Sequence, residues 1–573
     1  MLRAVCRAGF AMRFIPFLFC LSLLDLATPA RAGEMALPEA FRDRLEEGTK
    51  AGNWQAVAVG MVRGNESATW FFGHLEGRDG EGLDAHSRLE IGPVTEAYTG
   101  LLLADRAVAG KLRLGDSLRH ALGDDKAIVD TTLANLSLDQ LATYQGGLPA
   151  VPPNLFPRQE DDPLVGYDKA ALDSLLAQCA CSSAASWTGS LLQYGLLGQV
   201  LAQEGDFASL LRERVLSPLQ LDNTGYGDTG LVAGHALGTG AGAWHYAALL
   251  GAGGLRSDLT DQLRLVQTLL HPGDTSLRAA VLLARQPHAN HAALGWHVLD
   301  VKGKEQDWPV LWNGGSSGGH ASFVGFRADQ QEAVVLLGNA SSDLVALGLA
   351  LLADLPPPEP PARLKRLDAQ AAARYAGLYQ FSPHDEFILR SGPQGLWLQR
   401  KGQFAQELLA YDEDAFDLPG RNAQLTFHRN EAGNIDEMLL HEAGLNRAAQ
   451  RLTQRAPTLS RPTIEVKGEA LEDCAGDYAL TALEHLHLTP AGTQLRWQVS
   501  GNVPRLLSAF APDRYASAEG DLELHCVRDD AGKVSRVELN LADGDMKAAR
   551  VIPVAAPAAK VDGKKEEVKS SKH

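Results

Sequence analysis

The residues best suited to covalent chemistry are two serines set among glycines. Gly314 to Gly318 (GGSSG) matches the pattern Gly-x-Ser-x-Gly, in which a serine hydroxyl attacks an acyl carbon. Such a serine works only on a sharp strand-to-helix turn, with His and Asp supplied from elsewhere in the chain. Because Ser316 and Ser317 lie between two strand-like runs, we expect a glycine-rich turn here. His320 follows closely, and we expect it to line a cleft.

Three histidines could bind a metal ion, since His-x-x-His places two imidazoles on one helix face. They are His288, His291 and His297. No Glu stands beside them in a zinc-protease pattern, and Pro287 disturbs a helix. We therefore expect a surface loop, and the sequence predicts no metal and no cofactor.

Cys179 and Cys181 are separated by one residue and do not form the redox pattern Cys-x-x-Cys. Two free thiols, two strained thiols and an intermolecular bond all remain open for this pair.

The segment Leu89 to Leu118 predicts the element that would position an active site. It begins like a strand and continues with apolar residues at helical spacing, from Val94 through Tyr98 to Leu103. Gly110 ends the helical pattern.

This segment resembles the nucleophile helix of serine β-lactamases, class C in particular, and of the related D,D-peptidases and esterases. The resemblance extends over residues 40–350. Its further landmarks are Thr143 to Pro149 (TYQGGLP), Gly195 to Gly198, Pro218-Leu219, Gly253 to Leu255 with Ser257, Leu311 to Phe326, and the strand Ala333 to Asn339.

The first family motif is altered at both of its functional positions. In the family this helix opens with Ser-x-x-Lys, which places nucleophile and base on successive turns of one face. Here Pro93 stands at the serine position and Glu96 at the lysine position. Proline has no nucleophile, and it lacks the backbone N–H that the family uses in its oxyanion hole. Glu96 could act as a base, or it could simply favour the first turn of a helix.

The second and third motifs are altered as well. The family's Tyr-x-Asn moves a proton and holds the substrate amide, and its positions hold Gly189 and Leu191. The family's Lys-Thr-Gly or His-x-Gly places a cation on an inner strand, and Asn313 stands there. Asn313 can hydrogen-bond but does not titrate near neutrality.

The resemblance implies an α/β architecture plus an all-α lobe, with an antiparallel sheet flanked by helices. It also implies a cleft suited to peptidoglycan-like peptides or amides. The residues that we expect to remain there as binding groups are Glu96, Gln145, Asn313, Ser316 and Ser317.

The C-terminal part contains a duplication with a constant offset of 99 residues. Tyr375 to Tyr379 matches Cys474 to Tyr478, and Phe427 matches Cys526. Short alternating runs predict two small antiparallel β-domains. If the matched positions touch, Cys474 and Cys526 form a disulfide in an oxidising compartment; two buried free thiols are the alternative.

The N-terminus predicts export. Arg3, Arg7 and Arg13 precede an apolar run from Phe14 to Leu24, and Ala30-Arg31-Ala32 follows as a cleavage site. The expected organisation is a signal peptide at 1–32, a β-lactamase-like domain at 33–354, linkers at 355–364 and 454–465, β-domains at 365–453 and 466–553, and a disordered tail at 554–573.

Charge excludes several partners. Cleavage would remove four arginines and Asp25, which moves the formal charge from −17 to about −20. An acidic protein is a poor partner for nucleic acid or anionic lipid. We expect no stable membrane span after cleavage, because the apolar run is shorter than the roughly 20 residues that a span needs.

Two functions of different classes follow. The favoured one is a catalytically inactive, periplasmic or secreted protein that binds a peptidoglycan-like peptide, another small amide or a periplasmic protein. The alternative is an active amide or ester hydrolase with a relocated nucleophile.

Overall fold

The computed structural model describes residues 35–551 with gaps. The residues left out inside this range are 76–80, 150, 153, 156–161, 179–189, 237–238, 274, 289–290, 302–307, 341–343, 360–363, 383–384, 393–394, 401–404, 418–422, 443–444, 453–462, 467, 481–484, 500–503, 518–521 and 542–544. The expected signal peptide and tail, Cys179, Cys181 and Gly189 therefore lie outside the described residues.

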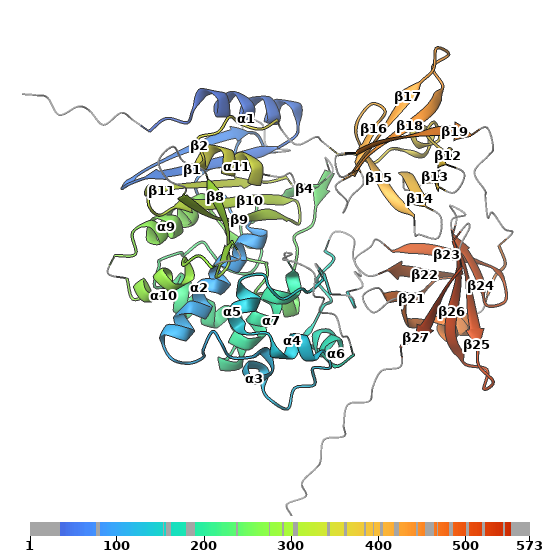
Figure 1. Ribbon diagram of the computed structural model, residues 1–573, viewed down its shortest axis with the longest axis horizontal. Coiled ribbons are helices and arrows are strands. Elements are labelled where there is room, and N and C mark those ends of the chain that lie inside the picture. The colour runs from blue at the N-terminus through green and yellow to red at the C-terminus, as the bar shows by residue number, and fades with distance from the viewer. Residues whose placement is uncertain are drawn as a thin grey trace, which may run out of the picture. The chain divides into compact units, whose positions relative to one another are not determined.

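A twisted antiparallel sheet forms the centre of the first domain (Figure 1). Within the described ranges it has seven strands in the order β2-β1-β11-β10-β9-β8-β7. The strands are β1 (Ala56–Arg63), β2 (Glu66–Gly73), β7 (Ala292–Ala293), β8 (Trp296–Val301), β9 (Trp308–Ser317), β10 (His320–Arg327) and β11 (Glu332–Gly338). Every residue of β10 is buried, as expected for a central strand covered on both faces.

Helices cover both faces of this sheet. Gly60 of β1 lies against Leu259 and Leu263 of α9 (Leu259–Leu270). Phe323 of β10 lies on the other face, against Gly348 of α11 (Val345–Leu352). The remaining elements at the sheet are α1 (Glu39–Ala51), α10 (Arg278–Ala284), and the short pairs β3 (Leu89–Glu90) with β6 (Arg256–Ser257) and β4 (Gly234–Ala236) with β5 (Thr239–Ala241).

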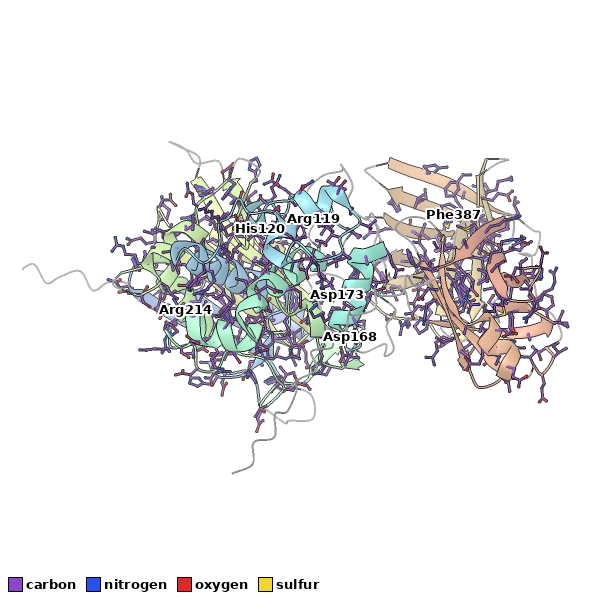
Figure 2. The ribbon with its side chains drawn as sticks, turned by 90° about the horizontal axis from the view of Figure 1, so that it is seen from below. Arg119, His120, Asp168, Asp173, Arg214 and Phe387 are labelled. Atoms are coloured by element: carbon purple, nitrogen blue, oxygen red, sulfur yellow. A yellow bond between two sulfur atoms is a disulfide. The ribbon has the colours of Figure 1, made fainter. Side chains whose placement is uncertain are left out.

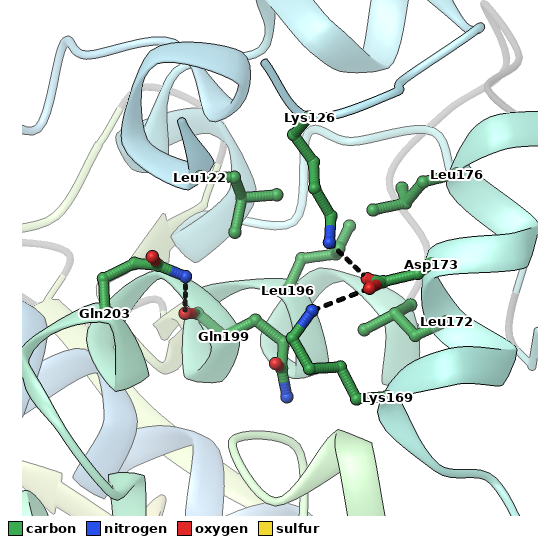
Figure 3. Close-up of a pocket in the computed structure, with 9 residues that line it drawn as sticks. All are labelled: Leu122, Lys126, Lys169, Leu172, Asp173, Leu176, Leu196, Gln199 and Gln203. Carbon is green, nitrogen blue, oxygen red and sulfur yellow. Dashed lines mark hydrogen bonds and ion pairs between the residues drawn. The ribbon is translucent and has the colours of Figure 1, made fainter. Parts of the chain in front are cut away.

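A helical lobe completes the domain. Its elements are η1 (Gly92–Val94), α2 (Thr95–Val108), α3 (Leu118–Leu122), α4 (Thr131–Asn135), α5 (Leu138–Ala142), α6 (Lys169–Gln178), α7 (Leu191–Leu201), η2 (Ala202–Glu204), α8 (Phe207–Leu211), η3 (Arg212–Leu216) and η4 (Ala247–Leu249). Figure 2 shows Arg119 and His120 on α3 and Asp173 on α6. Residues of α3, α6, α7 and η2 line a small cavity (Figure 3). None of the helices built by the described residues is long and apolar enough to cross a bilayer.

Two closed antiparallel barrels follow, each with eight strands among the residues that the structure describes. The first contains β12 (Gly377–Ser382), β13 (Asp385–Gly392), β14 (Gly395–Arg400), β15 (Gln406–Asp412), β16 (Ala415–Asp417), β17 (Ala423–Arg429), β18 (Ile435–Glu442) and β19 (Leu445–Leu452), preceded by α12 (Ala369–Ala372). The second contains β20 (Gly476–Ala479), β21 (His485–Ala491), β22 (Gln494–Val499), β23 (Arg505–Ala511), β24 (Arg514–Ser517), β25 (Glu523–Arg528), β26 (Val534–Asn540) and β27 (Asp545–Arg550), preceded by α13 (Gly468–Cys474). The predicted fold class is thereby confirmed for all three parts.

The barrels repeat one another in their polar contacts. In the first, Arg429 Nε donates to Asp414 at 2.6 Å, and in the second Arg528 Nε donates to Asp513 at 2.8 Å. Both aspartates have positive φ, 58° and 57°. Each pair of equivalent residues is 99 positions apart, which supports the duplication at the level of individual side chains.

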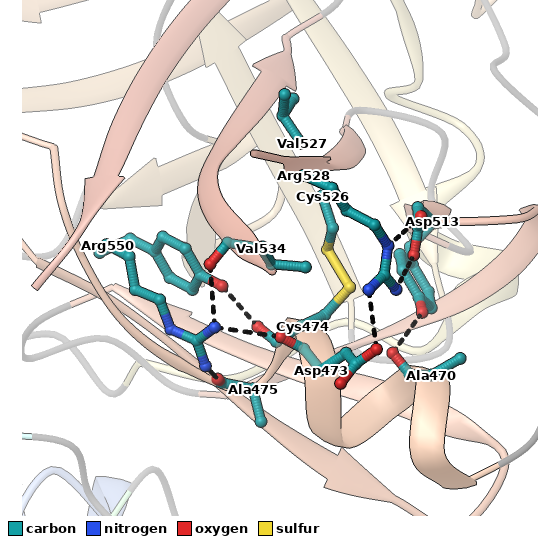
Figure 4. Close-up of a disulfide and its surroundings, with 12 residues drawn as sticks. Ala470, Asp473, Cys474, Ala475, Asp513, Cys526, Val527, Arg528, Val534 and Arg550 are labelled. Carbon is teal, nitrogen blue, oxygen red and sulfur yellow. Dashed lines mark hydrogen bonds and ion pairs between the residues drawn. A yellow bond between two sulfur atoms is a disulfide. The ribbon is translucent and has the colours of Figure 1, made fainter. Parts of the chain in front are cut away.

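The predicted disulfide is present between Cys474 and Cys526, whose Cα atoms are 5.9 Å apart (Figure 4). At the equivalent positions of the first barrel the rings of Tyr375 and Phe427 touch, with centroids 5.0 Å apart. One copy therefore joins these two positions by ring packing, and the other joins them by a covalent bond.

Candidate functional site

Pro93 lies in η1, at the N-terminal end of α2, directly against the inner strand β9. A Cβ placed on Gly315 of β9 would be only 2.9 Å from Cγ of Pro93. One residue earlier, a Cβ on Gly92 would be 3.4 Å from Oγ of Ser317. The N-terminal end of α2 thus faces Gly315 to Ser317 of β9, and Pro93 lies at that end.

Proline is well suited to this position structurally. It lies in η1, whose first N–H groups have no helical partner, so its lack of an N–H costs little. The chain before it is fixed because Ile91 N–H donates to Leu255 at 3.0 Å and Ser322 Oγ donates to Ile91 at 2.8 Å. The helix is well formed, yet neither a hydroxyl nor a backbone N–H is available at residue 93.

Glu96, Tyr144 and Asn313 form one buried hydrogen-bonded cluster, which we call the Glu96 cluster. The Tyr144 hydroxyl donates to Glu96 Oε2 at 2.6 Å. Asn313 Nδ2 lies 3.4 Å from the same carboxyl oxygen and donates to Gly295 O at 2.9 Å. The three residues are at most 6% exposed. The carboxyl group of Glu96 on α2 therefore contacts the amide of Asn313 on β9.

Tyr144 is held by the backbone and by neighbouring rings. It has φ of 61° just beyond α5, a conformation that residues other than glycine adopt rarely. Its ring stacks on His297 with centroids 4.5 Å apart, and His297 also contacts Trp312. The hydroxyl of Tyr194 fixes the end of α5 by donating to Ala142 O at 2.5 Å.

Close backbone packing brings β8 against α2 beside this cluster. Gly295 has φ of 82°, and a Cβ there would be 2.4 Å from the Glu96 carbonyl oxygen. Glycine is required because any side chain would push the helix away. The same glycine offers the carbonyl that accepts from Asn313, so one close approach aligns two members of the cluster.

The Glu96 cluster carries no charge at neutral pH. Burial raises the pKa of Glu96 from its ordinary 4.5 to about 8, although hydrogen bonds from Tyr144 and Asn313 act in the opposite direction. Burial also raises the pKa of Tyr144 well above 10, and it lowers the pKa of His297 to about 4. A neutral carboxyl group, a neutral phenol and a neutral imidazole therefore stand together here.

A second polar cluster surrounds Ser317. Its hydroxyl donates to Glu90 Oε2 at 3.1 Å, and both side chains are at most 3% exposed. Glu90 is paired with Arg256 at 3.1 Å and accepts the Trp244 N–H at 2.9 Å. His320 Nδ1 lies 3.4 Å from Glu90, without the angle of a hydrogen bond. Glu90 thus contacts Ser317, Arg256 and Trp244 at once, and these contacts order the end of β9.

Ser316 lies on the opposite side of β9. Alternate residues of a strand face alternate sides, so Asn313, Gly315 and Ser317 share one face. Gly314 belongs to the other face, because a Cβ there would be 3.1 Å from Val345 of α11. Ser316 shares that orientation and is exposed. The expected glycine-rich turn is wrong for both serines, because β9 continues through Ser317 and the turn lies at Gly318 and Gly319. The Gly-x-Ser-x-Gly motif thus lies at the end of a strand and in the β9–β10 hairpin, away from any strand-to-helix turn.

The other predicted residues lie apart from one another. Gln145 is exposed and donates to Thr143 at 2.8 Å, and Leu191 is half-buried at the start of α7. His288 pairs with Asp139 at 3.6 Å, whereas His291 pairs with Asp300 at 3.3 Å. The expected surface loop is wrong for His297, which lies in β8 and stacks on Tyr144. In the described parts of the chain, no group of three or more His, Cys, Asp or Glu side chains could hold a metal ion.

The structure brings Glu96 and Asn313 together, as their motif positions imply, and adds Tyr144, which the motifs did not single out. The signal for Tyr144 was present, because it belongs to the segment TYQGGLP already used as a landmark. What could not be seen was that its hydroxyl points at residue 96.

The first domain thus has an antiparallel sheet between two helical layers, with the N-terminal end of α2 against the inner strand β9. The family model described as Beta-lactamase matches residues 41–373, more than half of the 573-residue chain. The chain therefore belongs to the Beta-lactamase family.

Proposed function

We propose that this chain is a catalytically inactive, exported member of the Beta-lactamase family that serves as a periplasmic binding or interaction protein. The observation that carries the proposal is Pro93, which lies at the helix opening against Gly315 of β9. Acyl transfer at this place needs a hydroxyl and an oxyanion donor, and proline supplies neither.

The neighbouring groups point in the same direction. Glu96 is buried, protonated and hydrogen-bonded to Tyr144, so its carboxyl group does not act as a base. Pro93 also offers no hydroxyl for it to deprotonate. Asn313 directs its amide at Gly295 and the Glu96 cluster, where it adds no cation for a substrate carboxylate. Catalytic groups of this kind act as a unit, and the loss of one removes several orders of magnitude in kcat.

A relocated nucleophile is the second candidate, because Ser317 Oγ lies 3.1 Å from the Glu90 carboxylate. Two observations weigh against it. Ser317 and Glu90 are almost fully buried, and Glu90 is already paired with Arg256. Ser316 is accessible but faces away from Pro93.

The binding proposal concerns neutral or weakly polar amides. Pro93 is half-buried and Gln145 is exposed next to Tyr144, so both can contact a ligand from solvent. Glu96, Asn313 and Ser317 are buried, so they would not contact the ligand directly but would hold the residues beneath Pro93 and Gln145 in place. A peptidoglycan-like peptide offers amide groups that suit a glutamine side chain and backbone donors.

Activity is tested with the full mature chain. A chromogenic β-lactam, p-nitrophenyl esters and a fluorophosphonate probe should give no turnover above buffer and no labelled serine. A labelled serine that disappears in Ser317→Ala or Ser316→Ala would establish the rival function. Restoring the family residues through Pro93→Ser, Glu96→Lys, Gly189→Tyr, Leu191→Asn and Asn313→His should recover weak acylation if the surrounding fold is that of an acylating enzyme.

Binding and export have separate tests. Muropeptides should raise the Tm of the wild type, and Gln145→Trp should abolish that shift. Gln330→Trp, which alters an exposed glutamine of the β10–β11 turn, is the matched control and should leave it unchanged. Cell fractionation with mass analysis should find the protein in the periplasm, beginning near Gly33. Retention of residues 1–32 on a cytoplasmic protein would contradict export.

A further inference from the structure

A short segment, residues 242–246, lies against the end of β9, and we call it the strap. A Cβ placed on Gly318 would be 2.5 Å from Gly242 O and 2.9 Å from Cδ1 of Trp244. Gly318 directly follows β9 and belongs to the turn that leads into β10. The strap therefore packs against the β9–β10 turn, next to Ser317 of the candidate site.

The strap is anchored on both sides of its histidine. The Trp244 N–H donates to Glu90 Oε1 at 2.9 Å, and Arg256 Nη2 donates to Trp244 O at 2.9 Å. Glu90 and Arg256 are both almost fully buried. Two residues further along, the ring of Tyr246 is buried against Gly253. What the histidine adds is a connection to other segments of the domain.

His245 makes that connection through both ring nitrogens. Its Nδ1 lies 2.6 Å from Asp162 Oδ2, and its Nε2 lies 2.9 Å from Asp228 Oδ2. The His245 backbone N–H donates to the other oxygen of Asp162 at 2.9 Å. Asp162 belongs to the segment before α6, and Asp228 belongs to the loop before β4. These three residues, which we call the His245 clasp, thus join three separate segments.

Only a doubly protonated ring can donate to both aspartates of the His245 clasp. A neutral imidazole has one N–H and one bare nitrogen, so one carboxylate would face a lone pair at hydrogen-bonding distance. The imidazolium ion donates to both carboxylates. The contact with Asp162, and then that with Asp228, raises the pKa of His245 against the opposing effect of burial. Geometry and charge therefore agree on a protonated His245.

Asp228 keeps a positive partner whatever the state of His245. Its Oδ1 lies 2.9 Å from Arg256, which also pairs with Glu90 at 3.1 Å. Arg88 donates to two carbonyl groups of the loop that carries Asp228, at 2.8 and 2.9 Å. Arg256, Glu90 and Arg88 are thus the charged groups on this side of the clasp. They hold the Asp228 loop even when His245 is neutral.

The Asp162 side depends on the proton. The Asp162 side chain is only 9% exposed, and among the residues that the structure describes its one cationic partner is His245. A nearly buried carboxylate that loses its cation is strongly destabilised. Neutral His245 should therefore separate from Asp162, and its backbone N–H should lose its acceptor at the same time.

We propose that protonated His245 holds the strap against Asp162, and that loss of the proton releases the strap on this side. Because the pKa of His245 is raised, the clasp should be complete below pH 6.5 and should open as the pH rises through the folded value. Release loosens the strap beside the β9–β10 turn, so the order of this end of the candidate site follows the pH. The proposal concerns the protein without ligand and does not depend on the proposed function.

The test combines histidine-ring NMR of the full-length protein with hydrogen exchange by mass spectrometry, between about pH 5.5 and about pH 8.5. The His245 ring, identified by the signal that disappears in His245→Gln, should titrate above pH 6.5. After correction for intrinsic rates, strap amides should exchange about tenfold faster above this titration than below it, because a charge-assisted hydrogen bond is lost. Titration of His245 at or below pH 6.5, or exchange that stays constant through its titration, overturns the proposal.

Variants separate the His245 clasp from other effects of pH. His245→Gln cannot ionise, so its strap should exchange equally fast at both ends of the range. Asp228→Asn should move the transition to lower pH, because one of the two carboxylates that favour the imidazolium is gone. His291→Gln, which alters an exposed histidine that pairs with Asp300, is the matched control and should keep the wild-type profile. A wild-type pH dependence in His245→Gln would assign the effect to another group and refute the clasp.

Discussion

Replacing Glu96 by Gln tests whether the carboxyl group of the Glu96 cluster is protonated in the folded protein. Gln keeps a carbonyl oxygen for the Tyr144 hydroxyl and has nearly the same size, but it cannot ionise. The wild type must keep a proton on Glu96 that the unfolded chain releases. We therefore expect Glu96→Gln to be more stable than the wild type near neutral pH.

The magnitude follows from the two pKa values. The folded pKa of Glu96 is about 8, and the ordinary value of 4.5 applies to the unfolded chain. Because the folded pKa is the higher one, the contribution of Glu96 to stability is fully present below pH 4.5 and is lost as the pH rises to about 8. At about 1.4 kcal/mol for each pH unit, the loss by pH 7 is about 3 kcal/mol.

The assay is urea unfolding of both proteins between pH 4 and pH 8.5, followed by tryptophan fluorescence. The barrels contribute equally to both curves, so the difference reports the β-lactamase-like domain. The two proteins should agree near pH 4 and diverge as the pH rises, with the variant more stable. Glu66→Gln, at an exposed position of β2, should show no such divergence. A constant difference across this range, or a wild type that is the more stable protein at pH 8, would refute the neutral Glu96 cluster.

Two further predictions concern stability. The disulfide closes a loop of 52 residues, so the double variant Cys474→Ala, Cys526→Ala should lose about 2–4 kcal/mol in the second barrel, whereas Cys474→Tyr with Cys526→Phe should recover part of it. Hydrogen exchange by mass spectrometry should show faster exchange in residues 476–550 and no change in residues 377–452; equal loosening of both barrels would contradict this assignment. His245 lies between Asp162 at 2.6 Å and Asp228 at 2.9 Å, and these contacts, the first above all, raise its pKa. Because the pKa of His245 is raised in the folded protein, its contacts with Asp162 and Asp228 should stabilise the fold below pH 6.5. This stabilisation should be lost as the pH rises through the folded pKa. His245→Gln should remove that pH dependence from the rate of limited proteolysis, and an unchanged pH profile would count against it.

The sequence predicted the fold best where a segment repeats at a constant offset and where the residue type, such as a cysteine pair, allows few structural roles. The 99-residue offset predicted two equivalent β-domains, a contact between residues 375 and 427, and a disulfide between Cys474 and Cys526. The ring contact and the disulfide are both present. Closure of each domain into a barrel could not be derived, because closure depends on pairing between the first and last strands, such as Leu378 with Leu452.

At the site, motif spacing predicted that Pro93, Glu96 and Asn313 belong to one site, and in the structure Pro93 lies against Gly315 of β9 while Glu96 lies beside Asn313. Spacing could not show that Tyr144 turns its hydroxyl toward Glu96, because this depends on a positive φ and on stacking against His297. It also gave no sign that Ser316 and Ser317 face opposite sides of β9.

The uncharged Glu96 cluster changes what the domain can attract from a distance. The motif comparison predicts that Glu96 and Asn313 occupy positions where the family has a lysine and a second cation, and a pair of cations draws carboxylate-bearing compounds inward. Without those cations the Glu96 cluster adds no positive field of its own to a chain of net charge −17, which repels anions at long range. Encounter with acidic compounds should therefore be slow and should accelerate as salt is added, the reverse of the behaviour of a cationic site.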